Sequence, residues 1–207
     1  MDEAWRAIFE RNAEQDLPLH RMSCWTKKGY EERLEAFPRI LERVSGVKTV
    51  LDVGCGPGVY AEKLHENGYD VTGVDYAQAA LEKARRRVPE ARFVLADGYR
   101  LPYENDAFDL VISIGALQCL KDHRAFTREL ARVAKKAVVL STLRRRTKSD
   151  PDKELEKALK KDEWPARSYH QDDLKPLLEQ KGFDVEVITS LDGREFSDFF
   201  FLVARKP

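Results

Sequence analysis

The segment at positions 49–67 constrains the fold of this chain most, because a short strand-forming run leads through closely spaced glycines into a helical stretch. Thr49–Val53 is mostly apolar, and glycines follow at positions 54, 56 and 58. Glycine tolerates positive φ angles and lets a ligand approach the backbone without an intervening Cβ. The helix that follows presents unpaired N–H groups at the same place. We therefore expect a binding site for a nucleotide-like cofactor at this bend.

The chain from position 70 to position 142 continues to alternate between apolar runs and amphipathic stretches. This pattern predicts strands at 70–74, 92–96, 108–114 and 137–142, and helices at 57–67, 77–88 and directly after the capping residue Asp122. Apolar strands separated by amphipathic helices indicate a parallel sheet covered on both faces, an α/β fold. Two later runs, 185–190 and 196–204, flank Asp192-Gly193 and predict an antiparallel hairpin.

Two predicted helices precede the first strand, at 2–14 and 30–44, and Pro38 lies inside the second of them. Because proline removes a helical hydrogen bond, we expect a kink or a restart there. The polar, charged stretch 143–168 predicts a helical insertion over the ligand-binding crevice. We therefore divide the chain into N-terminal helices that cover the site, 1–46, and an α/β domain, 47–207.

Acidic residues follow or end three of the predicted strands, where ligands of parallel sheets bind. Asp52 precedes the first glycine, so it would repel a pyrophosphate and suits a ligand with a cationic group. Val59 stands where the dinucleotide fingerprint requires glycine. Asp75 can accept hydrogen bonds from both hydroxyls of a ribose, or it can cap the next helix. Asp97 can accept a hydrogen bond from an exocyclic amine such as adenine N6, or it can form a simple turn.

Four segments, in their order and spacing, resemble the class I S-adenosylmethionine-dependent methyltransferases: Val50–Tyr60, Val71–Tyr76, Leu95–Gly98 and Phe108–Leu120. The run Arg128-Glu-Leu-Ala-Arg-Val-Ala and the later Tyr169-His-x-x-Asp-Leu with Gly182-Phe are similar to the small-molecule branch, the methyltransferase type 11 group with the ubiquinone- and menaquinone-type enzymes. The resemblance covers about residues 30–207. It implies a Rossmann-like, mostly parallel seven-stranded sheet whose last strand is antiparallel.

The same resemblance implies S-adenosylmethionine as cofactor, S-adenosylhomocysteine as product, and methyl transfer to an O, N or C atom of a small molecule. It places the cofactor against the residues Tyr30, Asp52, Gly54, Cys55, Gly56, Gly58, Asp75, Tyr76, Asp97, Gly98 and Ile114. In this assignment Asp52 faces the amino group, Asp75 holds the ribose and Asp97 reads the adenine. Tyr76 lies against the adenine, and Tyr30 touches the carboxylate end.

No residue is predicted to be catalytic, because the methyl group on a sulfonium is already electrophilic. Gln118 and His170 are candidates on the substrate side, and His123 is a weaker one. Each also has a simpler interpretation as a cap or a helix-surface residue. Five aromatic residues outside the core pattern either form a lid or pack the appended helices: Trp5, Phe9, Trp25, Tyr30 and Trp164.

The composition limits the partners that we expect. Lys+Arg and Asp+Glu both total 36, so net charge does not favour nucleic acid. The basic run Arg144–Arg146 leaves open an RNA or protein methyltransferase, and a non-catalytic S-adenosylmethionine-binding protein is a further alternative. There is no apolar run of roughly 20 residues for a membrane span, no signal-peptide pattern and no zinc-ligand spacing. Three scattered cysteines favour the cytoplasm. We expect a monomer or homodimer without a metal.

Overall fold

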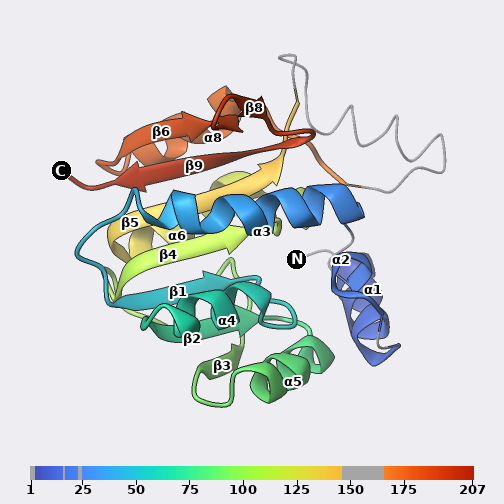
Figure 1. The fold of residues 1–207 in the computed structure, drawn as a ribbon. Coiled ribbons are helices and arrows are strands. Elements are labelled where there is room, and N and C mark those ends of the chain that lie inside the picture. The colour runs from blue at the N-terminus through green and yellow to red at the C-terminus, as the bar shows by residue number, and fades with distance from the viewer. Residues whose placement is uncertain (1–2, 16, 23–24, 146–165) are drawn as a thin grey trace.

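A computed structural model describes residues 3–15, 17–22, 25–145 and 166–207 (Figure 1). The strands are β1 (Thr49–Val53), β2 (Asp70–Asp75), β3 (Arg92–Leu95), β4 (Phe108–Ile114), β5 (Ala134–Leu143), β6 (Asp184–Ile188), β7 (Ser190–Leu191), β8 (Arg194–Glu195) and β9 (Phe199–Arg205). The helices are α1 (Glu3–Glu14), α2 (Leu19–Met22), α3 (Lys27–Leu41), α4 (Val59–Glu66), α5 (Gln78–Arg87), α6 (His123–Val133) and α8 (Gln171–Glu179), with a 3₁₀ turn, η1 (Leu117–Cys119). Within these ranges no helix has the length and apolar character needed to cross a bilayer.

Seven strands form one sheet in the order β3-β2-β1-β4-β5-β9-β6. All neighbours pair in parallel except β9, which is antiparallel to both β5 and β6. The predicted mostly parallel seven-stranded sheet with an antiparallel last strand is therefore confirmed, and β9 lies between β5 and β6, inside the sheet. The strand order reverses between β1 and β4, which is where such sheets bind ligands.

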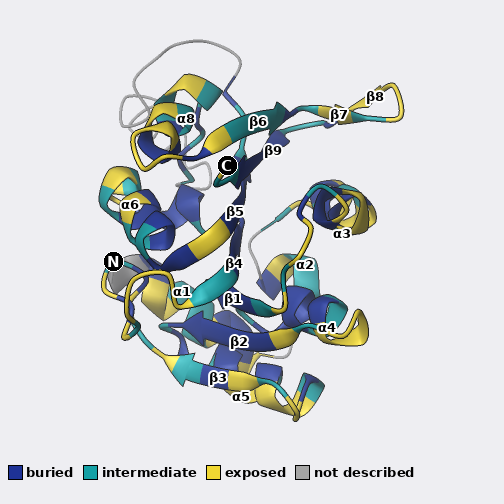
Figure 2. Cartoon of the chain, turned by 90° about the vertical axis from the view of Figure 1, so that its left-hand side faces the viewer, coloured by how far each residue is buried: buried dark blue, intermediate teal, exposed yellow. Residues whose placement is uncertain are grey.

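Helices cover both faces of the sheet (Figure 2). On one face, α3, α4 and α5 bury apolar residues such as Phe37, Leu64 and Leu81 against the strands. On the other face, α6 and α8 bury residues such as Phe126 and Leu174. The strands between them are apolar on both sides, as the sequence pattern predicts for a parallel sheet. Helices α1 and α2 lie beyond the carboxyl ends of β1 and β4 (Figure 1).

Helix α3 has no restart at Pro38, which is one of the two predicted outcomes there. The helix runs without a restart from Lys27 to Leu41, with Pro38 inside it. A proline costs one helical hydrogen bond, and the packing of the helix against the core can outweigh that cost. Phe37 and Ile40, on either side of Pro38, are fully buried in the core, so tertiary packing carries the helix through the proline.

The predicted closing hairpin is present, and its turn residues behave as expected. Asp192 and Gly193 both have positive φ angles, 51° and 77°, between the short strands β7 and β8. Positive φ at both central positions is typical of the hairpin turns that Asp-Gly pairs favour. The predicted insertion at 143–168 falls mostly outside the described residues, which end at position 145 and resume at position 166.

Helix α1 is attached to the rest of the chain through the start of α5. Ala77, at the N-cap position of α5, has no side chain that could cap the helix. The carboxylate of Glu10 in α1 takes this role, since it accepts hydrogen bonds from the backbone N–H groups of Gln78 (2.8 Å) and Ala79 (2.9 Å). A carboxylate is favourable at a helix N-terminus because it satisfies unpaired N–H groups and complements the helix dipole.

Candidate functional site

A cavity lies at the carboxyl edge of the sheet, between the glycine bend after β1, the end of β2, the loop after β4 and helices α1 to α3. The predicted site residues that line it are Tyr30, Gly54, Cys55, Gly56, Asp75, Tyr76, Gly98 and Ile114. The remaining predicted residues, Asp52, Gly58, Asp97, Gln118 and His170, are not in the cavity wall. Residues that lie far apart in the sequence thus converge on one place.

The glycine bend is tied to the neighbouring strand by its own backbone. The N–H groups of Gly54 and Cys55 both donate to the carbonyl oxygen of Val74, at 2.8 and 3.1 Å. Gly56 has a φ angle of 51°, and a Cβ at this position would meet nothing within 4 Å. A side chain at Gly56 would therefore project into open space beside the bend, where the residue lines the cavity.

The other two glycines of the motif allow neighbouring elements to pack closely against the bend. A Cβ on Gly54 would lie 2.7 Å from the Cβ of Ala116, in the loop after β4. A Cβ on Gly58 would lie 3.0 Å from the Cβ of Ala84, in α5. The spacing of the motif thus combines one position open to a ligand with two close contacts between elements.

Asp75 holds the bend and starts a helix. One carboxylate oxygen accepts a hydrogen bond from Gly56 N–H at 2.8 Å, and the other accepts one from Ala77 N–H at 2.9 Å. Burial raises the pKa of Asp75, and these backbone hydrogen bonds oppose the rise. Each carboxylate oxygen can accept more than one hydrogen bond, so the capping role leaves capacity for a ligand hydroxyl.

Asp52 lies in β1 next to the bend, and it is only 1% exposed. Its Oδ2 atom has no hydrogen-bond partner among the residues described. Burial, and then the nearby charge of Asp75, raises the pKa of Asp52 to about 8. A buried carboxylate with an unused oxygen is costly unless something pairs with it, so this group fits a cationic ligand group nearby.

We expect the raised pKa of Asp52 to appear in the pH dependence of stability. A carboxyl group with a higher pKa in the folded chain binds more protons when folded, so stability falls as pH rises between the two pKa values. For Asp52 this window extends from about 4 to about 8. Denaturant unfolding at pH 5 and pH 8.5 should show a larger loss of stability in the wild type than in Asp52→Asn.

Asp109 provides a control, because its pKa is shifted in the opposite direction to that of Asp52. Its pKa is lowered by its hydrogen bond and ion pair with Lys136, at 2.9 Å. Its stabilising contribution is therefore present above pH 4 and lost as the pH falls, so Asp109→Asn should weaken the protein more at pH 8.5 than at pH 3. Parallel unfolding profiles for wild type and Asp52→Asn would contradict the assignment of Asp52.

An aromatic wall closes the cavity on the side of α1 to α3. Phe9, Trp25 and Tyr30 line it, and Phe9 meets the ring of Tyr76 edge-on at 6.3 Å. Trp5 stacks behind Phe9 at 5.6 Å. The positions of Phe9, Trp25 and Tyr30 fit the interpretation as a lid, and the position of Trp5 fits the interpretation as packing. Trp164 lies outside the described residues.

Trp25 is the most closely fitted part of this wall. A Cβ on Gly115, at the end of β4, would lie 2.0 Å from the indole ring of Trp25. Gly115 also has a φ angle of 82°, which L side chains rarely adopt. The glycine after β4 thus makes room for the indole, a relation between two distant positions that the sequence does not reveal.

Asp97 takes the simpler of its two predicted roles in this structure. Its side chain is exposed and accepts a hydrogen bond from Tyr99 N–H at 3.0 Å, which forms a turn. The neighbouring residues Ala96 and Gly98 line the cavity, whereas Asp97 does not. Contact between Asp97 and an adenine stays a prediction.

The substrate-side candidates lie in different settings. Gln118 is 2% exposed, in contrast to a helix-surface position, and its Oε1 atom has no partner within the described part of the chain. His170 is the N-cap of α8, where its Nδ1 accepts from Asp172 N–H at 3.3 Å. His123 is the first residue of α6 and lies 5.0 Å from the ring of Tyr169. The local contacts of His170 therefore favour the capping interpretation over a catalytic base.

The two described arginines of the basic run at 144–146 both form ion pairs within the protein. Arg144 pairs with Glu195 at 2.7 Å. Arg145 is 6% exposed and pairs with Asp173 at 2.6 Å. Arg146 lies outside the described residues. Neither of the two described arginines is a freely solvated charge at the mouth of the cavity.

Arg33 is a buried charged residue that the sequence pattern missed, and it contacts Trp25 of the cavity wall. It is 1% exposed and lies between the rings of Trp25 and Phe199, with its Cζ atom 4.7 and 4.2 Å from the two ring centres. Arg33 is four positions before the buried Phe37, on the same side of α3. The sequence feature that could have identified Arg33 is its position as a charged residue on the apolar face of a predicted helix.

Comparison with known proteins agrees with this geometry. Residues 51–142 match the family model described as "Methyltransferase domain". The phthiotriol/phenolphthiotriol dimycocerosates methyltransferase of Mycobacterium tuberculosis is 33% identical over 132 residues, 60% of this chain and 47% of that protein. The malonyl-[acyl-carrier protein] O-methyltransferase of Halorhodospira halophila is 42% identical over 109 residues, 48% of this chain and 37% of that protein. The chain spans about half the length of these curated relatives, or less.

A solved structure extends the likeness to the whole fold. The S-adenosylmethionine-dependent methyltransferase of Thermotoga maritima, described as a possible histamine N-methyltransferase, superposes with a TM-score of 0.70 at 20% identity. The match covers 97% of this chain and 99% of that one. Residues 51–142 thus match a methyltransferase domain, and the sheet order, with the cavity at its carboxyl edge, is the fold of the class I S-adenosylmethionine-dependent methyltransferases.

Proposed function

We propose that this protein transfers the methyl group of S-adenosylmethionine to an O, N or C atom of a small molecule. One observation carries the proposal: two buried acids, Asp52 near the end of β1 and Asp75 at the end of the adjacent β2, lie beside a glycine bend that borders a cavity. The unused oxygen of Asp52 supports a ligand with an ammonium group, and the remaining capacity of Asp75 supports a ribose.

The residues around the cavity fit such a cofactor in our assignment. Asp52 balances the amino group, Asp75 holds the ribose hydroxyls, and Tyr76 lies along the adenine. Gly56 offers an approach to the backbone, and Ile114 borders the reacting centre. The remaining predicted contacts, those of Tyr30, Gly54, Cys55, Gly58, Asp97 and Gly98, stay part of the same proposal.

The protein's contribution to the reaction is positioning and the exclusion of water. S-adenosylmethionine, when bound, supplies a methyl group that is already electrophilic because it sits on a positively charged sulfur. Phe9, Trp25 and Tyr30 cover the cavity and can shield it from solvent. Holding two reactants in line can contribute about 7–11 kcal/mol to lowering a barrier. A general base is needed only if the acceptor must lose a proton.

The cavity walls support an apolar part in the acceptor molecule. Leu120, Phe126 and Cys119 extend the lining beyond Ile114. Burial raises the pKa of the other lining thiol, Cys55, so it stays protonated and is not a nucleophile. The methyl acceptor is therefore a ligand in our proposal, and no side chain of the chain accepts the methyl group.

The engaged arginines weigh against the RNA alternative. The ion pairs of Arg144 and Arg145 neutralise two of the charges that supported it. We propose that the enzyme works in the cytoplasm, which the free, buried thiol of Cys55 supports. Its state as a monomer or a homodimer stays a prediction.

Calorimetric titration with S-adenosylhomocysteine tests the proposal. We expect saturable binding at micromolar concentrations. Near pH 7 binding should release protons, because an ammonium beside Asp52 lowers the pKa of that carboxyl group. Titrations in two buffers of different ionisation enthalpy measure this release, and Asp52→Asn should lose it. Absence of binding to the wild type would exclude the proposed function.

A further inference from the structure

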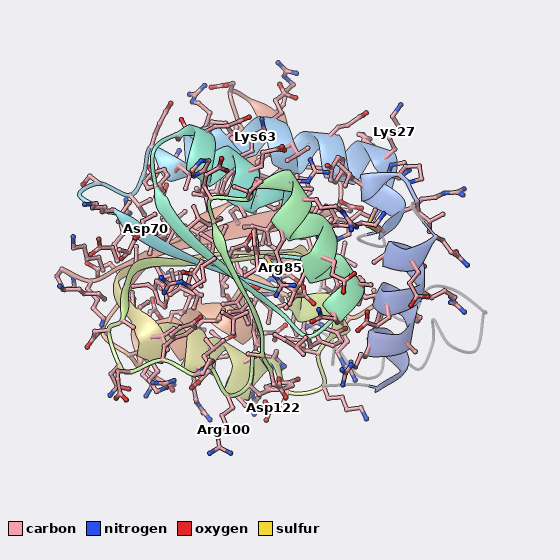
Figure 3. All side chains as sticks on the ribbon, turned by 90° about the horizontal axis from the view of Figure 1, so that it is seen from below. Lys27, Lys63, Asp70, Arg85, Arg100 and Asp122 are labelled. Atoms are coloured by element: carbon pink, nitrogen blue, oxygen red, sulfur yellow. The ribbon has the colours of Figure 1, made fainter. Side chains whose placement is uncertain are left out.

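Two loops that border the cavity, 96–99 after β3 and 116–122 after β4, are joined by the side chain of Tyr99. Its hydroxyl oxygen accepts a hydrogen bond from the backbone N–H group of Asp122 at 3.0 Å. Figure 3 shows Asp122 near Arg100, the residue that follows Tyr99. Tyr99 is half-buried and is not in the cavity wall, so its effect on a ligand is indirect.

The 96–99 loop borders the cavity through Ala96 and Gly98. It is anchored to the sheet by the N–H group of Ala96, which donates to the carbonyl oxygen of Asp75 at 3.0 Å. The carboxylate of Asp97 accepts a hydrogen bond from the N–H group of Tyr99 at 3.0 Å, which forms a turn. In the proposed function the adenine lies at Asp97 and Gly98. A ligand held there lies against the turn that orients Tyr99.

The 116–122 loop supplies part of the apolar lining that the proposed function assigns to the methyl acceptor. Cys119 and Leu120 line the cavity. Two residues later, Asp122 is the N-cap of α6, and its carboxylate accepts a hydrogen bond from Ala125 N–H at 2.9 Å. The N–H group of Asp122 donates to Tyr99. Tyr99 therefore holds the end of the loop that carries Leu120.

The ring of Tyr99 adds an apolar contact to this link. It meets the ring of Phe126, in α6, at 6.1 Å and 83°, a favourable edge-to-face arrangement. Gly98 lies against the same ring, because a Cβ at this position would be 2.5 Å from Cε2 of Phe126. Phe126 itself lines the cavity. The 96–99 loop is thus fitted to the start of α6 by one hydrogen bond and by ring packing.

We propose that Tyr99 is a positioning residue that orders the acceptor side of the cavity when the cofactor binds. The proposal rests on the proposed function, which supplies the cofactor. A cofactor that restrains the 96–99 loop restrains the 116–122 loop as well, because the hydrogen bond between Tyr99 and Asp122 joins them. The methyl acceptor then meets Cys119 and Leu120 already in place, so less ordering remains to be done when the acceptor binds.

Amide hydrogen exchange, measured by NMR with and without S-adenosylhomocysteine, tests this role. In the wild type, the ligand should slow exchange at the amides of both Tyr99 and Asp122. Tyr99→Phe keeps the ring and removes the oxygen that accepts from Asp122. In this variant the Asp122 amide should exchange roughly 2–12-fold faster, as expected for the loss of one hydrogen bond. The ligand should then slow exchange only at position 99, whereas a merely structural role would leave the response of Asp122 to the ligand unchanged.

Tyr103 provides the matched control. Its hydroxyl is buried without a hydrogen-bond partner among the described residues, and its ring meets that of Phe108 edge-on at 4.9 Å. Tyr103→Phe therefore removes a hydroxyl group without removing a link between the two loops, and the response of the Asp122 amide to the ligand should persist. Tyr99→Leu removes the contact with Phe126 as well, so the Asp122 amide should exchange at least as fast as in Tyr99→Phe.

The outcomes separate the role of Tyr99 from the proposed function. If S-adenosylhomocysteine binds the wild type but slows exchange only in the 96–99 loop, the positioning role is overturned while the proposed function stands. The same conclusion follows if Tyr99→Phe keeps the slowing at Asp122. If S-adenosylhomocysteine does not bind, the proposed function fails, and the positioning role that depends on it fails as well. The wild-type arm needs no variant, so it decides the question even if Tyr99→Phe does not fold.

Discussion

Gly115→Ala should reduce methyl transfer by about a hundredfold or more, because displacement of reacting groups by about 1 Å can cost that much. The added Cβ would lie 2.0 Å from the indole of Trp25, a separation that no relaxed contact allows. The residue must also keep a φ angle of 82°, which costs an L-residue roughly 1–2 kcal/mol. Trp25 would have to move, and with it the wall beside the end of β4. The measurement is the initial rate of S-adenosylhomocysteine formation with an identified acceptor, together with the melting temperature.

Gly182→Ala separates backbone strain from the clash. Gly182 has nearly the same φ angle, 81°, and a Cβ there would meet nothing within 4 Å. This control should lose a similar amount of stability from backbone strain but keep its activity. Trp25→Leu combined with Gly115→Ala should recover part of the fold stability by making room for the methyl group. If Gly115→Ala and Gly182→Ala retain the same activity, the contact between Gly115 and Trp25 does not contribute to methyl transfer.

Asp75→Ala should weaken binding of S-adenosylhomocysteine at least tenfold and also destabilise the fold. The substitution leaves the buried N–H group of Ala77 without its acceptor, at a cost of about 1–3 kcal/mol, and it also removes the acceptor of the half-buried Gly56 N–H group. The glycine bend loses its hydrogen bond to the side chain of Asp75, and the start of α5 loses the hydrogen bond of Ala77 N–H. Both segments border the cavity, so the shape of the cavity should change. Calorimetry with the same ligand and denaturant unfolding measure both effects.

Asp70 is the matched control for Asp75. It begins the same strand, is exposed, and lies on the opposite side of the molecule from α1 (Figure 3). Asp70→Ala should therefore leave ligand binding unchanged and alter stability by a few tenths of a kcal/mol, as surface substitutions usually do. Equal losses of affinity in the two variants would show that Asp75 acts only through general stability.

Much of the fold could be predicted from local pattern. The strands β1 and β4 have the predicted bounds, and Asp122 caps α6 through Ala125 N–H at 2.9 Å. These features depend on residues close together in the sequence, such as an apolar run or a capping side chain three positions before its donor. The position of Asp52 and Asp75 beside one bend also followed from the rule that parallel strands present their carboxyl ends at one edge.

The features that escaped prediction depend on contacts between distant positions. The contact of Trp25 with Gly115 and the stacking of Arg33 on Phe199 each join elements that are separated by more than eighty residues. The uninterrupted course of α3 through Pro38 reflects the burial of Phe37 and Ile40, which the local effect of proline does not include. Sequence periodicity identifies which face of an element is buried, but not which partner it meets there.

The hydrogen bonds by which Glu10 caps α5 affect the free energy needed to open the cavity. The wall residue Phe9 belongs to the same helix, so a movement of α1 away from the sheet must withdraw Glu10 from the amides of Gln78 and Ala79. Loss of a helix cap costs about 1 kcal/mol. Any ligand entry by this route is therefore thermodynamically linked to fraying at the start of α5.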